Sequence, residues 1–148
     1  MSASIVISIV ALAVSVVSIT WQTWSWLRSG PVIRVSTSNS IPTYGDQLGA
    51  QHLTVTAENR GRAAATIEGW GLLLPNDGKI IAIGDPLLGA PSLPHRLDSH
   101  SSASWYMLFA DVARHCEERG VAPSDVQAFV RVSGQGLRTG RKGLPMAR

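Results

Sequence analysis

The sequence of 148 residues predicts a mainly β protein, in which an N-terminal transmembrane helix precedes an immunoglobulin-like β-sandwich of about seven strands with one short helix. Three observations support this fold class. The first 27 residues contain no charged side chain. From residue 32 onward, apolar residues recur mostly at every second position, as half-buried strands require. Glycines, prolines, asparagines and aspartates separate these stretches at short intervals. A partly open β-barrel is the alternative architecture.

The N-terminal stretch has the length of a membrane-spanning helix. As an α-helix, residues 5–27 would extend about 34 Å, slightly more than the ~30 Å hydrocarbon core of a bilayer. Pro31 disfavours helical backbone at the residue before it, so the helix should end there. Indole rings favour the headgroup zone, and a first arginine marks where the chain meets water. The residues expected at the membrane interface are Trp21, Trp24, Trp26 and Arg28.

A cleaved signal peptide is the rival interpretation of this stretch. It would need basic residues before the apolar run and small residues at a cleavage site after it. No Lys or Arg precedes the run, and bulky tryptophans occupy the region where cleavage would fall. We therefore expect an anchor in the cell membrane. Arg28 and Arg34 follow the helix, so the positive-inside rule places the β domain in the cytoplasm.

Within the helix, small and polar residues recur at alternating steps of four and three. This period gives a stripe that drifts slowly around an α-helix. In lipid, helices associate where small residues let backbones approach and where polar side chains bond across the contact. Alternatively, the hydroxyl groups bond back to carbonyls one turn earlier in their own helix. We call this stripe the small-residue seam; it comprises Ser4, Ser8, Ala11, Ser15, Ser18, Gln22 and Ser25.

The alternation of apolar residues locates the strands of the β domain. Strands are expected over residues 32–35, 53–58, 64–74, 79–83, 102–107, 126–132 and 137–141, with turn-rich or loop segments at 36–50 and 84–94. In the longest strand the buried parity switches at Gly69, where a β-bulge would lie. The expected organisation is an anchor over residues 1–28, a linker over 29–31, an immunoglobulin-like domain over 32–142 and a basic tail over 143–148.

One helix is expected over residues 110–119. Asp111 lies in its first turn, Arg119 in its last turn, and Gly120 follows as a cap. The segment from Pro75 to Gly78 is a hairpin turn signal, and the segment from Asn59 to Arg62 is a tight-turn signal.

The run Glu58-Asn59-Arg60-Gly61-Arg62, followed by Thr66, Gly69, Trp70 and Gly71 behind an apolar helix, resembles small membrane-anchored proteins of high-GC Gram-positive bacteria and their phages. The resemblance covers the anchor and the first half of the domain, and its motif consists mostly of turn and packing residues. It implies an immunoglobulin-like fold on a tether and brings no catalytic residues.

The residue types that usually perform catalysis or bind metals are few and dispersed. The histidines are His52, His95, His100 and His115, and no cysteine pair or HExxH helix accompanies them, so we expect exposed loop histidines and no metal. Cys116 is the only cysteine, which excludes an intrachain disulfide, and is expected to be a buried apolar side chain. The glycines at 134, 136 and 140 miss the GxGxxG spacing, so a hairpin is expected there. No cofactor is expected.

Basic side chains concentrate at the C-terminal end. They could contact anionic headgroups if the domain is cytoplasmic, or they could be a solvated terminus. Nucleic acid is not an expected partner, because residues 131–148 contain no aromatic side chain on which bases could stack. The residues assigned to anionic-lipid contact are Arg138, Arg141, Lys142 and Arg148.

These features predict a single-pass, membrane-anchored protein-interaction module without catalytic activity. Its partners would be membrane lipid, another protein and, through the small-residue seam, further copies of itself. Three alternatives remain open: an accessory subunit of a larger membrane complex, a phage or prophage membrane protein that excludes other phages, and an enzyme.

Overall fold

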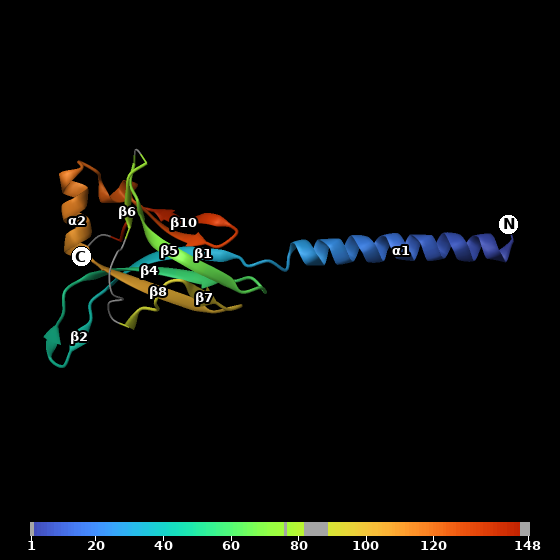
Figure 1. The fold of residues 1–148 in the computed structure, drawn as a ribbon, viewed down its shortest axis with the longest axis horizontal. Helices are drawn as coiled ribbons and strands as arrows, with labels where there is room; N and C mark the ends of the chain where they lie inside the picture. Colours follow the sequence, from blue (N-terminus) through green and yellow to red (C-terminus); the bar gives the residue numbers. More distant parts are fainter. Residues whose placement is uncertain (1, 76, 82–88, 146–148) are drawn as a thin grey trace. The chain divides into compact units, whose positions relative to one another are not determined.

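The computed structural model describes residues 2–75, 77–81 and 89–145 (Figure 1). The chain divides into two compact units, Met1–Gly30 and Pro31–Arg148, which are described separately below.

The first unit is the helix α1, Ala3–Leu27. It is an unbroken α-helix of 25 residues, and none of its residues is buried. Its most apolar 18-residue window has a mean hydropathy of 2.5, so the helix is long and apolar enough to cross a membrane. A signal sequence would have the same properties. The predicted N-terminal apolar helix is therefore confirmed.

In its described residues, the second unit contains two larger sheets and a two-stranded hairpin. The first sheet has the strand order β1-β4-β8, formed by Ile33–Ser40, His52–Asn59 and Ser102–Leu108. Both neighbouring pairs are antiparallel. In β4 the side chains of Leu53, Val55 and Ala57 are fully buried, which agrees with the predicted alternation.

The second sheet has the order β10-β9-β5-β6, and a further short strand, β7, also pairs with β5. The strands are β5 Ala65–Leu73, β6 Lys79–Ile81, β7 His95–Leu97, β9 Gln127–Val132 and β10 Gly136–Lys142. The register of β5 on β9 shifts between Ile67 and Gly69, which confirms the predicted bulge. The bulge lets Ile67 and Trp70, which are three residues apart, both be buried.

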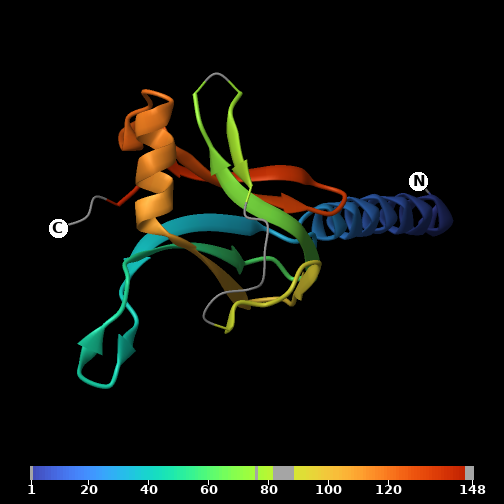
Figure 2. The ribbon, with the colours of Figure 1, turned by 60° about the vertical axis from the view of Figure 1, so that its left-hand side comes forward.

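The hydrophobic core lies between the two layers that these sheets form (Figure 2). Leu53 and Val55 reach it from the first sheet, and Leu72 and Val130 reach it from the second. Two tryptophans, Trp70 of the second sheet and Trp105 of the first, stack with ring centroids 6.4 Å apart. The fold is mainly β and the sheets do not close into a barrel, so the predicted class is confirmed and the barrel alternative is wrong.

The helix α2, Phe109–Glu118, directly follows β8. Val112 and Cys116 are its buried residues. It ends in a Schellman motif, in which the Gly120 N–H donates to the Glu117 carbonyl and the Val121 N–H to the Cys116 carbonyl. Gly120 has a φ of +62°, which explains the glycine that the sequence predicted at this end. A single 3₁₀ turn, Pro123–Asp125, leads into β9.

One part of the domain contains more strand than the sequence predicts. The segment 36–50 is expected to be turn-rich, but β1 continues to Ser40, and the short hairpin β2–β3, Thr43–Tyr44 and Gln47–Leu48, follows it. Pairing of Asn39 with Leu53 of the buried strand β4 overrides its weak strand propensity. The expected loop 84–94 and the end of the expected strand 79–83 include residues 82–88, which lie outside the described residues.

A buried asparagine connects three segments of the domain. The Asn59 side chain is fully buried. Its Oδ1 accepts the Val32 and Gly61 N–H groups at 3.3 and 3.0 Å. Its Nδ2 donates to the carbonyls of Ala63, Leu97 and Asp98 at 2.8, 3.3 and 3.2 Å. One amide therefore joins the start of β1, the β4–β5 connection and the end of β7.

Candidate functional site

The small-residue seam lies entirely on exposed helix surface. Its members from Ser4 to Ser25 all fall within α1, and all are exposed. The hydroxyls of Ser8, Ser15 and Ser18 donate to the backbone carbonyl four residues earlier at 2.8–2.9 Å. Each hydroxyl oxygen keeps lone pairs that can accept a further bond. The seam therefore offers a second helix close backbone approach, hydroxyl acceptors and the Gln22 amide.

The aromatic residues at the end of α1 interact with one another and with the first arginine. Trp21 and Trp24 meet edge to face with ring centroids 6.4 Å apart. The Arg28 guanidinium carbon lies 4.5 Å from the centre of the Trp24 ring, a cation–π contact. Trp26 is 75% exposed, so its indole is free to contact surrounding solvent or lipid.

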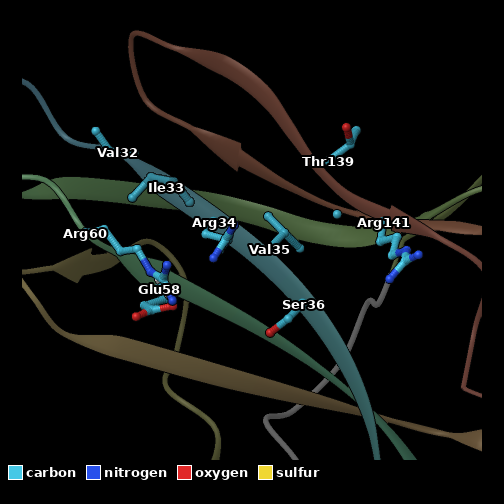
Figure 3. A pocket seen from close by; sticks show the side chains of 10 residues that line it. Val32, Ile33, Arg34, Val35, Ser36, Glu58, Arg60, Thr139 and Arg141 are labelled. Atoms are coloured by element: carbon cyan, nitrogen blue, oxygen red, sulfur yellow. Dashed lines mark ion pairs between the residues drawn. The ribbon is translucent and has the colours of Figure 1, made fainter.

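A concave surface of the β domain runs along β1 and β10. It is lined by Val32, residues 33–36 of β1, residues 139–141 of β10, and Glu58 and Arg60 (Figure 3). We call this surface the β1–β10 groove. It is open to solvent and has a volume of about 790 Å³. The strands β1 and β10 belong to different sheets, so no ladder closes the groove.

Gly140 lets the two strands come together beside the groove. A Cβ atom at Gly140 would lie only 2.9 Å from the Val35 carbonyl oxygen, so the backbones are in direct contact there. Arg34 and Arg141 are the chain neighbours of this contact pair. Consecutive Cα atoms are about 3.8 Å apart, so the Arg34 Cα lies this far from the Val35 Cα, and the Arg141 Cα lies this far from the Gly140 Cα. Both side chains line the same groove.

The groove is rich in positive charge. Its lining contains Arg34, Arg60 and Arg141 against one acidic residue, Glu58. The Arg60 Nε lies 3.0 Å from a Glu58 carboxylate oxygen, so this pair is largely neutralised. No ion pair joins Arg34 or Arg141 to the described acidic residues. Arg34 lies opposite Glu58 in the β1–β4 ladder without an ion pair to it, and the Ser36 and Thr139 hydroxyls are on the same lining.

Of the four basic residues assigned to lipid contact, the structure places one in the groove. Arg141 lines it, whereas Arg138 and Lys142 are exposed on β10 outside its lining. The Arg138 Nη2 donates to the Gln135 Oε1 at 3.3 Å. Arg148 lies outside the described residues. Sequence reasoning missed Arg34 and Arg60 as members of this site. The alternation of Arg34 with half-buried Ile33 and buried Val35 was visible, but the proximity of β1 to β10 was not.

The histidines occupy more structured positions than expected. His95 lies in β7, partly buried, with its ring edge-on to Trp105 at 6.3 Å between centroids. His52 is 7% exposed in β4, and its Nδ1 lies 2.7 Å from the Ala50 carbonyl oxygen. The prediction of exposed loop histidines is therefore wrong for these two residues. Among the described residues, no three histidine, cysteine or acidic side chains come together as metal ligands would.

Cys116 is a buried apolar side chain, as the sequence predicts. It is 2% exposed, and burial raises the pKa of its thiol. A raised pKa keeps the thiol protonated and weakens it as a nucleophile. The neighbouring His115 directs its Nδ1 to the Asp111 carbonyl oxygen at 3.1 Å.

The glycine-rich segment near residue 135 is a hairpin, as predicted. It joins β9 to β10, which pair antiparallel. Gly134 and Gly136 have φ values of +72° and +74°, a backbone conformation that glycine adopts without strain. A strand follows it, so no helix dipole is present to hold a phosphate.

No protein-family model matches the chain, and no curated protein matches it. One solved structure, the X-ray structure of Northeast Structural Genomics Consortium target SoR45, is similar with a TM-score of 0.32 and 12% sequence identity. The match covers 81% of this chain and 89% of that structure.

Proposed function

We propose that this chain is a single-pass membrane protein whose β domain binds another protein at the cytoplasmic membrane surface and catalyses no reaction. The observation that carries this proposal is the helix α1. It has 25 residues, no charged side chain and no buried side chain. An apolar helix that packs against nothing in its own unit is stabilised by lipid or by another apolar helix.

The β1–β10 groove supports a binding role. Its lining contains arginine, glutamate, hydroxyl and aliphatic side chains, without histidine or cysteine. Nucleophilic catalysis needs an activated nucleophile next to a base. Arginines that project into an open groove instead suit the recognition of an anionic surface.

Membrane extraction tests the anchor. We expect the full-length chain to stay with membranes through high-salt and alkaline washes and to be released by detergent. Its intact mass should include residues 1–30. A chain with Val14→Arg and Val17→Arg is the control, since each arginine at the helix centre opposes insertion by about 3 kcal/mol; it should lose retention. Recovery of a shortened chain lacking α1 would support a signal peptide and contradict the proposal.

The small-residue seam predicts self-association of the anchor. Replacing Ser8, Ser15 and Gln22 with leucine removes close approach and polar contacts, and should weaken dimerisation in a membrane reporter assay about tenfold. The matched control replaces Val10 and Val17 with leucine, off the seam, and should change little. Equal dimerisation of the original chain and both variants would contradict association through the seam.

An accessory subunit of a larger membrane complex is the second candidate, because the same exposed seam fits a different helix equally well. Crosslinking in native membranes distinguishes the two. Self-association should give a ladder of multiples of 15.8 kDa, whereas an accessory subunit should give one larger, different band.

A further inference from the structure

The β1–β10 groove has the chemistry of a phosphate site. Guanidinium groups present planar N–H pairs that match phosphate oxygens, and hydroxyls can donate to the same oxygens. Arg34 and Arg141 have no carboxylate partner among the described acidic residues. Ser36 and Thr139 also line the groove, so both kinds of donor are available along its lining.

Chain length keeps this groove near the end of α1. Its first lining residue, Val32, follows Leu27, the last residue of α1, by five positions. A chain of that length extends at most about 18 Å, whatever the orientation of the two units. If α1 crosses a bilayer, the groove therefore remains within reach of the headgroups of the leaflet in which α1 ends.

The start of the groove is also fixed to the domain. The Val32 N–H donates to Asn59 Oδ1, and the Val32 carbonyl accepts the Arg60 N–H at 2.8 Å. The Pro31 carbonyl accepts the Gln135 Nε2 at 3.1 Å. Arg28 and Ser29 donate their backbone N–H groups to the α1 carbonyls of Trp24 and Trp26, so few residues separate the hydrogen-bonded end of α1 from the start of the groove.

We infer that the β1–β10 groove binds the phosphate of an anionic phospholipid headgroup through Arg34 and Arg141. The aliphatic side chain of Val32, which is 57% exposed at the same lining, suits the glycerol and upper acyl region of such a lipid, which inorganic phosphate lacks. This inference rests on the proposed membrane anchor, since the anchor brings the groove to the lipid.

The inference is tested on the full-length chain held in phosphatidylcholine nanodiscs, so failure of the anchor would appear earlier, as failed reconstitution. Dihexanoyl phosphatidylglycerol, glycerol phosphate and inorganic phosphate are titrated separately, and binding is followed by NMR shifts of the arginine Nε–H signals. We expect saturable binding of the lipid, at least tenfold tighter than binding of inorganic phosphate. Arg34→Gln with Arg141→Gln should weaken lipid binding at least tenfold.

Arg138→Gln is the matched control, because Arg138 lies on the same strand as Arg141 but does not line the groove. It should leave the affinity within about twofold of the original. An equal loss in Arg138→Gln would show diffuse attraction to charge and overturn the inference. Equal affinity for lipid and inorganic phosphate would contradict the assignment of the phosphate to a lipid headgroup. Tighter binding of a glutamate-rich peptide, titrated in the same way, would contradict a lipid ligand and favour a protein ligand.

Discussion

Asn59→Asp should destabilise the β domain by at least about 4 kcal/mol. The substitution keeps the size of the side chain but replaces the Nδ2 donor with an oxygen. That oxygen would face the carbonyls of Ala63, Leu97 and Asp98, which Nδ2 now satisfies. A fully buried carboxylate among carbonyl oxygens is both desolvated and repelled. Whole domains are stable by only about 5–15 kcal/mol. A large fraction of the variant molecules should therefore be unfolded or close to unfolding.

Denaturant titration of the detergent-solubilised chain, followed by the circular dichroism of the sheets, measures this change in the free energy of unfolding. The exposed substitution Gln47→Glu is the matched amide-to-acid control and should shift it by less than about 0.5 kcal/mol. Burial raises the pKa of the introduced carboxyl above its unfolded value. The penalty should therefore shrink relative to the original chain as the pH falls and the group is protonated in both states. A variant of unchanged stability at neutral pH would refute the role assigned to Asn59.

Gly71→Ala should lower the free energy of unfolding by about 3 kcal/mol. Gly71 lies in β5 between β6 and β9, paired with Ile81 and Phe129. A Cβ atom there would overlap the Ile80 backbone carbonyl oxygen and would also contact the Phe129 ring. Backbone cannot yield as a flexible side chain can, so the β5–β6 hairpin would have to move.

Gly69→Ala supplies the control for this prediction two residues away in the same strand. A Cβ atom at Gly69 would meet nothing within 4 Å. The two variants share the same change in the entropy of the unfolded chain, so the difference between their unfolding free energies isolates the steric overlap. Equal effects of the two substitutions would contradict the close approach at Gly71. Hydrogen exchange of β6 amides should accelerate in Gly71→Ala alone.

Local patterns predicted the features that depend on neighbouring residues. The switch of parity around Gly69 located the bulge, because a strand with one buried face must insert a residue to change that face. Gly120 located the end of α2, and Gly134 and Gly136 located the β9–β10 hairpin. Each depends on backbone conformation or on side chains a few residues apart.

Features that depend on distant pairing were not predictable. The strand β7 has only three residues after a proline, and it exists because His95, Arg96 and Leu97 pair with β5. The groove requires β1 and β10, about a hundred residues apart, to meet at the boundary of two sheets. Single-strand periodicity contains no information about which strands become neighbours.

The composition of β10 has a consequence for copies of the domain that crowd together at high local concentration. This strand is at the edge of its sheet and has no buried residue. An antiparallel match between two such edges would place the cations of one copy, Arg138, Arg141 and Lys142, against those of the other. Repulsion between like charges opposes that match, as charged edges do in many sheet proteins. Crowding should therefore leave neighbouring domains folded side by side and not fused into a continuous, fibre-forming sheet.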